Sequence, residues 1–465
     1  MKKPDLFLEN GVIVTENSKF FGGVVVSNGV IERITSSGET VEAREIIDLG
    51  GKYLLPGLVD GHVHFHDPGR DYWEGYRTGT MAAAAGGVTT VVEMPLNGIP
   101  PTIDREKLAV KREIARINSV VDYAHWGGMV TDNLEHLPAM AEEGVVGYKA
   151  FTGGVGTPEF TAINDHVLFN GLRLSKELGN VVDIHAENES ITSTLKAQLK
   201  TAGRKDRQAW YDAHPIESEL EPVERAIFFA KATGGNLHLA HTSIPDGVRA
   251  VARAKSEGVN VTIETCPHYL VLDLDDFLRI GPEAKCVPPI RFREEVERMW
   301  QCIFEGLVDT IASDHSPCTN EEKDQGMDNI WQAWGGITGI QTMLPAILTE
   351  GVHKRGLPIT TVARLMASTP ARIFGLYPKK GSLQAGADAD FVVVDLDREW
   401  TFPVDQILSK NKHSLYVGFK FKGAIECTMV RGKTVSQGGR ICVAPGYGQL
   451  QVRGYRYRPI LPTHP

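Results

Sequence analysis

The alternation of apolar and helix-forming segments through the middle of the chain constrains the fold more than any other feature. Apolar runs recur about every 30–50 residues, as in repeated strand–helix units, and helical stretches such as 164–179 and 244–258 lie between them. Eight of the runs read as buried strands: 57–65, 87–95, 123–131, 144–152, 181–188, 237–243, 259–269 and 309–317. Eight such units favour a closed (β/α)8 barrel over an open doubly wound sheet, so the predicted fold class is α/β with a TIM-like barrel.

The two ends of the chain have a different pattern, of short alternating strands. Near the N-terminus two such strands flank Asn28-Gly29, a dipeptide typical of a two-residue hairpin turn. The segment 386–402 and the one that follows it have the same character. We therefore expect both ends to form one small β-sandwich domain. The predicted boundaries are 1–54 and 376–445 for that domain, 55–375 for the barrel, and 446–465 for a C-terminal tail that could pack on a neighbouring subunit.

Composition excludes several classes of protein. The 465 residues contain 49 Lys plus Arg against 58 Asp plus Glu, and this net charge of −9 argues against a nucleic-acid partner. No segment approaches 18 uncharged apolar residues, so we expect neither a membrane span nor an export signal. The six cysteines form no C-x-x-C pair, which is typical of reduced thiols in the cytoplasm.

Side chains that can bind metals or move protons fall at the carboxyl ends of the predicted strands, where barrel enzymes carry their active sites. They are His62, His64, Glu93, Lys149, His185, His241, His268 and Asp314. His62 and His64 share one strand face, about 7 Å apart along the chain, and can converge on one ion. His238 and His241 are three residues apart, so alternation puts them on opposite faces. We expect His241 to enter the site and His238 to pack against the helices.

Two of these residues have alternative interpretations. Lys149 ends an otherwise apolar strand and could simply be salt-bridged, or its amine could react with carbon dioxide to form a carbamate that bridges two cations. Asp314 could cap the next segment, or it could bind a cation and accept a proton from a water molecule. His66 and His268 also lie near the site but are less favoured as ligands.

The chain contains, in order, the motifs GHVH, GVVGYKAF, ASDH, STPARIFGL and KGSLQAGADADFVV. These motifs resemble those of the cyclic amidohydrolases with two metal ions, and the resemblance covers roughly residues 5–445. Within that superfamily, the segments CPHYLVLD, AKCVPPIR and NIWQAWGGITGIQTMLP look most like those of allantoinases. The resemblance implies two divalent cations, with zinc expected first and cobalt, manganese or iron as alternatives. The implied ligands are His62, His64 and Asp314 for one cation, His185 and His241 for the other, and a carbamylated Lys149 between them.

The same resemblance implies a reaction and a substrate. An activated water between the cations would open the hydantoin ring of allantoin to give allantoate in purine catabolism, with Asp314 as general base and acid. The implied substrate contacts are His66, Asn97, Val287 and Gly335. A cytoplasmic homotetramer acting on this small molecule is expected.

Related activities remain open alternatives. Dihydroorotases place Arg at the position of His66 and Asn at that of Leu96, and hydantoinases and dihydropyrimidinases place Tyr at that of Gly154. These differences favour the neutral substrate allantoin over the substrates of those enzymes. A third class, a non-enzymatic scaffold that has lost its metal ligands, is disfavoured because all six ligand positions are retained.

Overall fold

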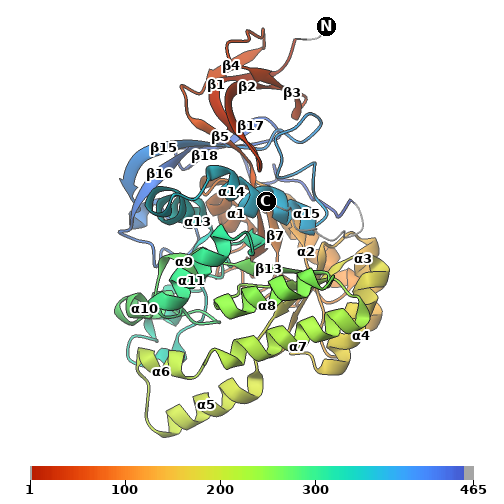
Figure 1. Ribbon diagram of the computed structural model, residues 1–465, viewed down its shortest axis with the longest axis vertical. Coiled ribbons are helices and arrows are strands. Elements are labelled where there is room, and N and C mark those ends of the chain that lie inside the picture. Colours follow the sequence, from red (N-terminus) through yellow and green to blue (C-terminus); the bar gives the residue numbers. More distant parts are fainter. Residues whose placement is uncertain (1–2, 455–465) are drawn as a thin grey trace.

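The computed structural model describes residues 3–454, and its central part is a closed barrel of parallel strands (Figure 1). Each of the eight predicted runs contains a strand. The barrel strands are β6 (Leu58–Val63), β7 (Val88–Glu93), β8 (Asp122–His125), β9 (Gly127–Gly128), β10 (Gly147–Phe151), β11 (Val181–His185), β12 (Leu237–Leu239), β13 (Val261–Thr265) and β14 (Thr310–Ile311). The third run is interrupted at Trp126, which separates β8 from β9. A parallel bridge between Val63 and His315 joins the last strand to the first, so the predicted TIM-like barrel is confirmed.

Helices follow the strands and cover the outside of the barrel (Figure 1). The helices are α1 (Tyr76–Ala85), α2 (Arg105–Asn118), α3 (Leu137–Glu142), α4 (Asp165–Leu178), α5 (Glu189–Thr201), α6 (Arg207–Asp212), α7 (Glu217–Thr233), α8 (Pro245–Ser256), α9 (Pro267–Val271), α10 (Leu274–Ile280), α11 (Arg293–Phe304), α12 (Asn320–Asp324), α13 (Met343–Ile347), α14 (Ile359–Ala363) and α15 (Thr369–Ile373). The predicted helix at 164–179 is α4. The Asn164 side chain caps its first turn, and Gly179 ends it in the left-handed conformation.

Side-chain alternation separates an apolar outer face of the barrel from a polar interior. Leu237 and Leu239 belong to the large apolar cluster that also includes residues of α7 and α8. His238, between them, points inward, and its ring lies 2.8 Å from the Thr262 hydroxyl. The expectation that His238 packs against the helices is therefore wrong. His241 also reaches the interior because its φ of 32° breaks the regular alternation on which that expectation rested.

Strands from both ends of the chain form one continuous sheet at one end of the molecule (Figure 1). Its strands are β1 (Leu6–Val14), β2 (Lys19–Ser27), β3 (Val30–Ser36), β4 (Glu45–Asp48), β5 (Tyr53–Pro56), β15 (Phe391–Thr401), β16 (Lys420–Val430), β17 (Lys433–Gln437) and β18 (Arg440–Ile441). The antiparallel pairing of β5 with β15 joins the N-terminal strands to the C-terminal ones. Asn28 and Gly29 have φ of 53° and 76° between β2 and β3, as the predicted hairpin turn requires.

The described part of the C-terminal tail lies against this chain's own barrel. The amide of Gly448 donates to the Ser119 carbonyl over 2.9 Å, and that of Gln451 donates to the Tyr123 carbonyl over 2.7 Å. Packing on a neighbouring subunit is therefore not required for residues up to 454, and positions 455–465 lie outside the described residues. Within residues 3–454, no helix combines the length and apolar character needed to cross a membrane.

Candidate active site

Three side chains form a compact group at the place where the first and last strands of the barrel meet. His62 and His64 come from the end of β6 and the residue after it, and Asp314 follows β14. The Oδ1 atom of Asp314 lies 3.3 Å from Nε2 of His62 and 3.3 Å from Nε2 of His64. Ligand atoms of all three residues lie within 4.8 Å of one another. The group can therefore chelate a single cation.

A second group continues from the first across the barrel interior. The ring of His241 lies 5.2 Å from that of His62, and its Nε2 is 2.9 Å from Nδ1 of His185. Lys149 ends in the same space: its amine lies 5.3 Å from the ring of Phe151, which stacks on His185 at 4.5 Å. The barrel thus brings all six predicted ligands into one buried, connected cluster.

Buried carboxylates behind the cluster orient its members. Glu264 on β13 lies 2.8 Å from Nδ1 of His62, which leaves Nε2 of that ring toward Asp314. It also accepts a hydrogen bond from the amide of His241 over 3.2 Å. Asp183 on β11 accepts a hydrogen bond from the Lys149 amine over 3.1 Å. Such carboxylate–imidazole pairs fix the ring orientation in metal sites.

Electrostatics put His64, His241 and Asp314 in the forms that bind cations. Burial lowers the pKa of His64 to about 4, and it lowers the pKa of His241 well below its usual value, so both imidazoles are neutral near pH 7. Burial by itself would raise the pKa of Asp314, but the charge of His62 and the hydrogen bond with His64 bring it down to about 2. A neutral imidazole and an ionised carboxylate are the ligand forms of these side chains.

The fit to metal ions can also be tested on unpaired atoms. Nδ1 of His64 and Nδ1 of His241 are buried, and neither has a hydrogen-bond partner among residues 3–454. Buried polar atoms of this kind are rare unless a ligand or ion accounts for them. Nitrogen and carboxylate donors suit zinc, cobalt, manganese and iron alike. The residues therefore fit a centre of divalent cations.

The backbone at this rim is conformationally unusual. Among the described residues, positive φ angles occur at only seven positions other than glycine, and four of them are His66 (61°), Asn97 (64°), His241 (32°) and Asp314 (45°). Such conformations cost free energy in non-glycine residues and are concentrated at functional sites. They turn the side chains at strand ends toward the common centre.

The cluster forms the floor of a cavity of about 320 Å³. The lining residues include the metal-binding candidates His62, His64, His185, His241 and Asp314. Three of the four predicted substrate contacts also line it: Asn97, Val287 and Gly335. The fourth, His66, is fully buried and stacks on His64 at a ring distance of 6.0 Å, and it is not one of the lining residues.

Comparison with known proteins agrees with this geometry. The model of the amidohydrolase family matches residues 53–435. The chain belongs to the amidohydrolase family. It is 42% identical over 443 residues to an allantoinase of Rubrobacter xylanophilus (95% of this chain and 96% of the relative) and 42% identical over 432 residues to one of Solibacter usitatus (92% and 94%). The structure of an L-hydantoinase (dihydropyrimidinase) from Arthrobacter aurescens superposes with a TM-score of 0.95 at 37% identity, covering 97% of this chain and all of that one.

Other candidates from the sequence have supporting positions in this amidohydrolase. Glu93 faces α1 and α2, where it pairs with the buried amine of Lys111 and accepts a hydrogen bond from the Phe65 amide over 3.3 Å. It thereby holds the turn between His64 and His66. His268 lies buried in α9 with its ring 4.2 Å from that of Tyr269.

Some site residues were missed by the sequence argument. Glu264 had a usable signal, since it is a charged residue on the same strand face as Thr262 within an apolar run. Lys285 and Trp331 line the cavity as well. They stand in segments already singled out for their resemblance to allantoinases, but nothing in local spacing indicates that these segments meet.

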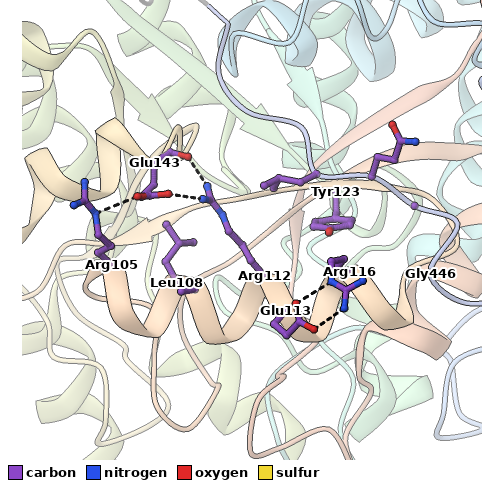
Figure 2. Close-up of a pocket in the computed structure, with 12 residues that line it drawn as sticks. Arg105, Leu108, Arg112, Glu113, Arg116, Tyr123, Glu143 and Gly446 are labelled. Carbon is purple, nitrogen blue, oxygen red and sulfur yellow. Dashed lines mark hydrogen bonds and ion pairs between the residues drawn. The ribbon is translucent and has the colours of Figure 1, made fainter.

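A larger cavity, of about 750 Å³, lies on the outside of the amidohydrolase barrel between α2 and residues 446–450 (Figure 2). Its three arginines are each paired with a glutamate: Arg105 and Arg112 with Glu143, and Arg116 with Glu113. The charges of this cavity are thus compensated within the chain. The volume of a cavity therefore does not by itself identify the active site in this protein.

Proposed function

We propose that this protein is an allantoinase, which hydrolyses the hydantoin ring of allantoin to allantoate in purine catabolism. The observation that carries the proposal is the buried cluster of His62, His64 and Asp314 beside His185 and His241, in a chain 42% identical to allantoinases over nearly its full length. The cavity above the cluster gives a small cyclic substrate access to it.

The cluster supports a specific assignment of metal ligands. His62, His64 and Asp314 would hold one divalent cation, and His185 and His241 a second. Lys149, as a carbamate formed from its amine and carbon dioxide, would bridge the two. Bound cations of this kind supply Lewis acidity, which polarises a carbonyl and lowers the pKa of a water molecule. Zinc is the proposed metal, with cobalt, manganese and iron as alternatives.

The chain's own residues would supply proton transfer and positioning. Asp314 lines the cavity and is ionised near neutral pH, so its carboxylate can take a proton from the attacking water and deliver it to the departing ring nitrogen. Asn97, Val287 and Gly335 line the cavity and would hold the ring. His66 has no surface in the cavity, and we propose that it acts on the site through its contact with His64.

The position of Gly154 favours allantoinase over the hydantoinase alternative. Hydantoinases carry a Tyr at this position, whereas Gly154 has a φ of +72° and a Cβ atom there would lie 2.5 Å from the Glu187 carboxylate. A tyrosine here would therefore strain the backbone and would have to displace the Glu187 carboxylate. The hydantoinase reading remains the second candidate because of the close likeness to the L-hydantoinase structure.

We further propose a cytoplasmic homotetramer. All six cysteines are unpaired, which supports a reducing compartment. The tetramer is supported by the family resemblance. Sedimentation of the purified protein would test it.

A side-by-side assay of allantoin, hydantoin, dihydrouracil and dihydroorotate tests the proposed activity. The expected result is ring opening of allantoin with the highest kcat/KM of the four, together with about two equivalents of divalent metal per chain, as a two-metal site requires. Faster turnover of hydantoin or dihydrouracil would favour the second candidate. A preparation without metal that added cations and bicarbonate cannot activate would contradict both.

A further inference from the structure

One wall of the substrate cavity is an irregular segment, residues 330–336. Trp331, Ala333, Trp334 and Gly335 of this segment line the cavity. Apart from the 3-10 turn Ile330–Gln332, the segment has no regular secondary structure. Its backbone carbonyls therefore need hydrogen-bond donors from elsewhere, because buried carbonyl groups are almost always paired.

Two buried lysines supply those donors. The amine of Lys285 donates to the carbonyls of Ile330 (2.8 Å) and Ala333 (2.5 Å). The amine of Lys323, on α12, donates to the carbonyls of Trp334 (3.0 Å) and Gly336 (2.7 Å) and to a third outside the wall, that of Pro282 (3.0 Å). Four of the seven wall carbonyls are thus held by two side chains.

Among the described residues, neither of these lysines has an acidic partner, and burial lowers the pKa of both amines. Lys285 is 3% exposed and Lys323 is 1% exposed, and no carboxylate of residues 3–454 lies within 4.0 Å of either amine. The Lys285 amine instead lies 4.0 Å from the centre of the Trp210 ring. Burying an ammonium group without a carboxylate is costly. Four of the six contacts made by the two amines are with the wall, which indicates that these residues hold the wall in place.

Lys285 also connects the wall to the segment that contains Val287, another predicted substrate contact. Its own carbonyl accepts a hydrogen bond from the Gly336 amide over 2.9 Å. Lys285 therefore fixes the segment that contains Val287 against the segment that contains Gly335. The wall also contacts the segment before α1, where the Trp334 ring lies 4.5 Å from that of Trp73.

We propose that Lys285 and Lys323 are positioning residues that clamp the wall 330–336 in its substrate-binding shape before the substrate arrives. The clamp sets how well the ring is bound, and it leaves the metal cluster and the chemical step untouched. The predicted effect on KM rests on the proposed function. The claim that the two lysines hold the wall in one conformation does not.

Hydrogen exchange of the unmutated holoenzyme, read by mass spectrometry without substrate, is the first test. Peptides that cover residues 330–336 are expected to exchange slowly, because the amide of Trp334 donates to the Glu322 carbonyl over 3.3 Å and that of Gly336 donates to the Lys285 carbonyl over 2.9 Å. Exchange as fast as that of an exposed loop overturns the proposal. This measurement needs neither a variant nor allantoin, so it decides the clamp even if the activity assignment fails.

The variants Lys285→Met and Lys323→Met remove the ammonium groups and keep the side-chain length. We expect faster exchange confined to 330–336, unchanged metal content, and a KM raised by about tenfold, the equivalent of one charged hydrogen bond, with kcat unchanged. Lys231→Met, at an exposed lysine paired with Glu257, is the matched control and should behave like the parent. Unchanged wall exchange in both folded variants, or a fall in kcat without a change in KM, overturns the clamp. If a variant does not fold, the exchange rate of the unmutated protein decides.

Discussion

Among residues 3–454, two buried clusters each bring three potential metal ligands together, and they lie in different parts of the fold. His62, His64 and Asp314 meet at the carboxyl ends of the barrel strands, while Asp122, Asp388 and Asp390 meet where β8 begins and the C-terminal strands leave the barrel. In the aspartate cluster, the amine of Lys380 contacts all three carboxylates, at 2.8 Å from Asp388 and 2.9 Å from Asp390.

The difference lies in what compensates the charge. The aspartate cluster carries its own cations, since Arg431 also pairs with Asp122. The histidine cluster instead keeps buried nitrogens without a partner among residues 3–454. A cluster neutralised by its own chain joins structural elements, whereas one with unpaired donors is built for a ligand. This division matches the barrel rule that function lies at the carboxyl ends of the strands and stability at the other end.

The largest effect is expected for Lys149→Ala, which would separate the two proposed cations. Activity should fall by at least about a thousandfold, because several kcal/mol of metal-derived stabilisation is lost. Short-chain carboxylates such as acetate or propionate should restore part of it by standing in for the carbamate. Steady-state kinetics with metal analysis measure this, and Lys231→Ala is the control. Turnover of Lys149→Ala equal to that of the parent would contradict the bridging role proposed for Lys149.

Asp314→Asn tests proton transfer within the histidine cluster. It preserves the shape of the side chain but removes its basic oxygen. We expect kcat to fall by about 10²- to 10⁴-fold, as for loss of a general acid–base group, with KM near that of the parent. Metal content must be measured in parallel, because Asp314 is also a candidate ligand. Undiminished kcat would eliminate the assigned role.

Lys380→Met tests the aspartate cluster and should have the opposite phenotype. Three buried carboxylates would lose their common cation, so the free energy of unfolding should fall by about 3–5 kcal/mol. The kcat and metal content of the folded fraction should remain those of the parent. Denaturant unfolding followed by circular dichroism measures the first quantity. If Lys380→Met were as stable as the parent but had lost its metal, the aspartate cluster would be a metal site and not a structural one.

Glu264→Gln should give the smallest of these effects. The amide retains an acceptor for the His62 ring but loses the charge that favours its orientation, so metal affinity should fall by about 10- to 100-fold. Titration of metal-free protein with zinc, followed by activity, measures the change. At saturating zinc the kcat should approach the parent value. A kcat that stays low at saturation would mean that Glu264 contributes more than ring orientation.

Much of this architecture follows from local sequence. The eight apolar runs locate the barrel strands from β6 to β14, Asn28-Gly29 marks a turn, and Asn164 with Gly179 bounds α4. The identity of the candidate ligands also follows, because reactive side chains at strand ends must converge when a barrel closes. The side on which His238 lies could not be predicted, because the prediction assumed regular alternation up to His241, where the backbone turns to positive φ.

The sequence by itself determined the order of the elements and the chemistry available at the strand ends, because strand alternation, turns and caps act over a few residues. Tertiary structure alone decided which buried charges are compensated. Lys380 reaches Asp122 from 258 residues away, and Lys285 reaches the Ala333 carbonyl across 48. No local period encodes such approaches. They are fixed only when the packed chain excludes water and each buried charge must find a partner within the fold.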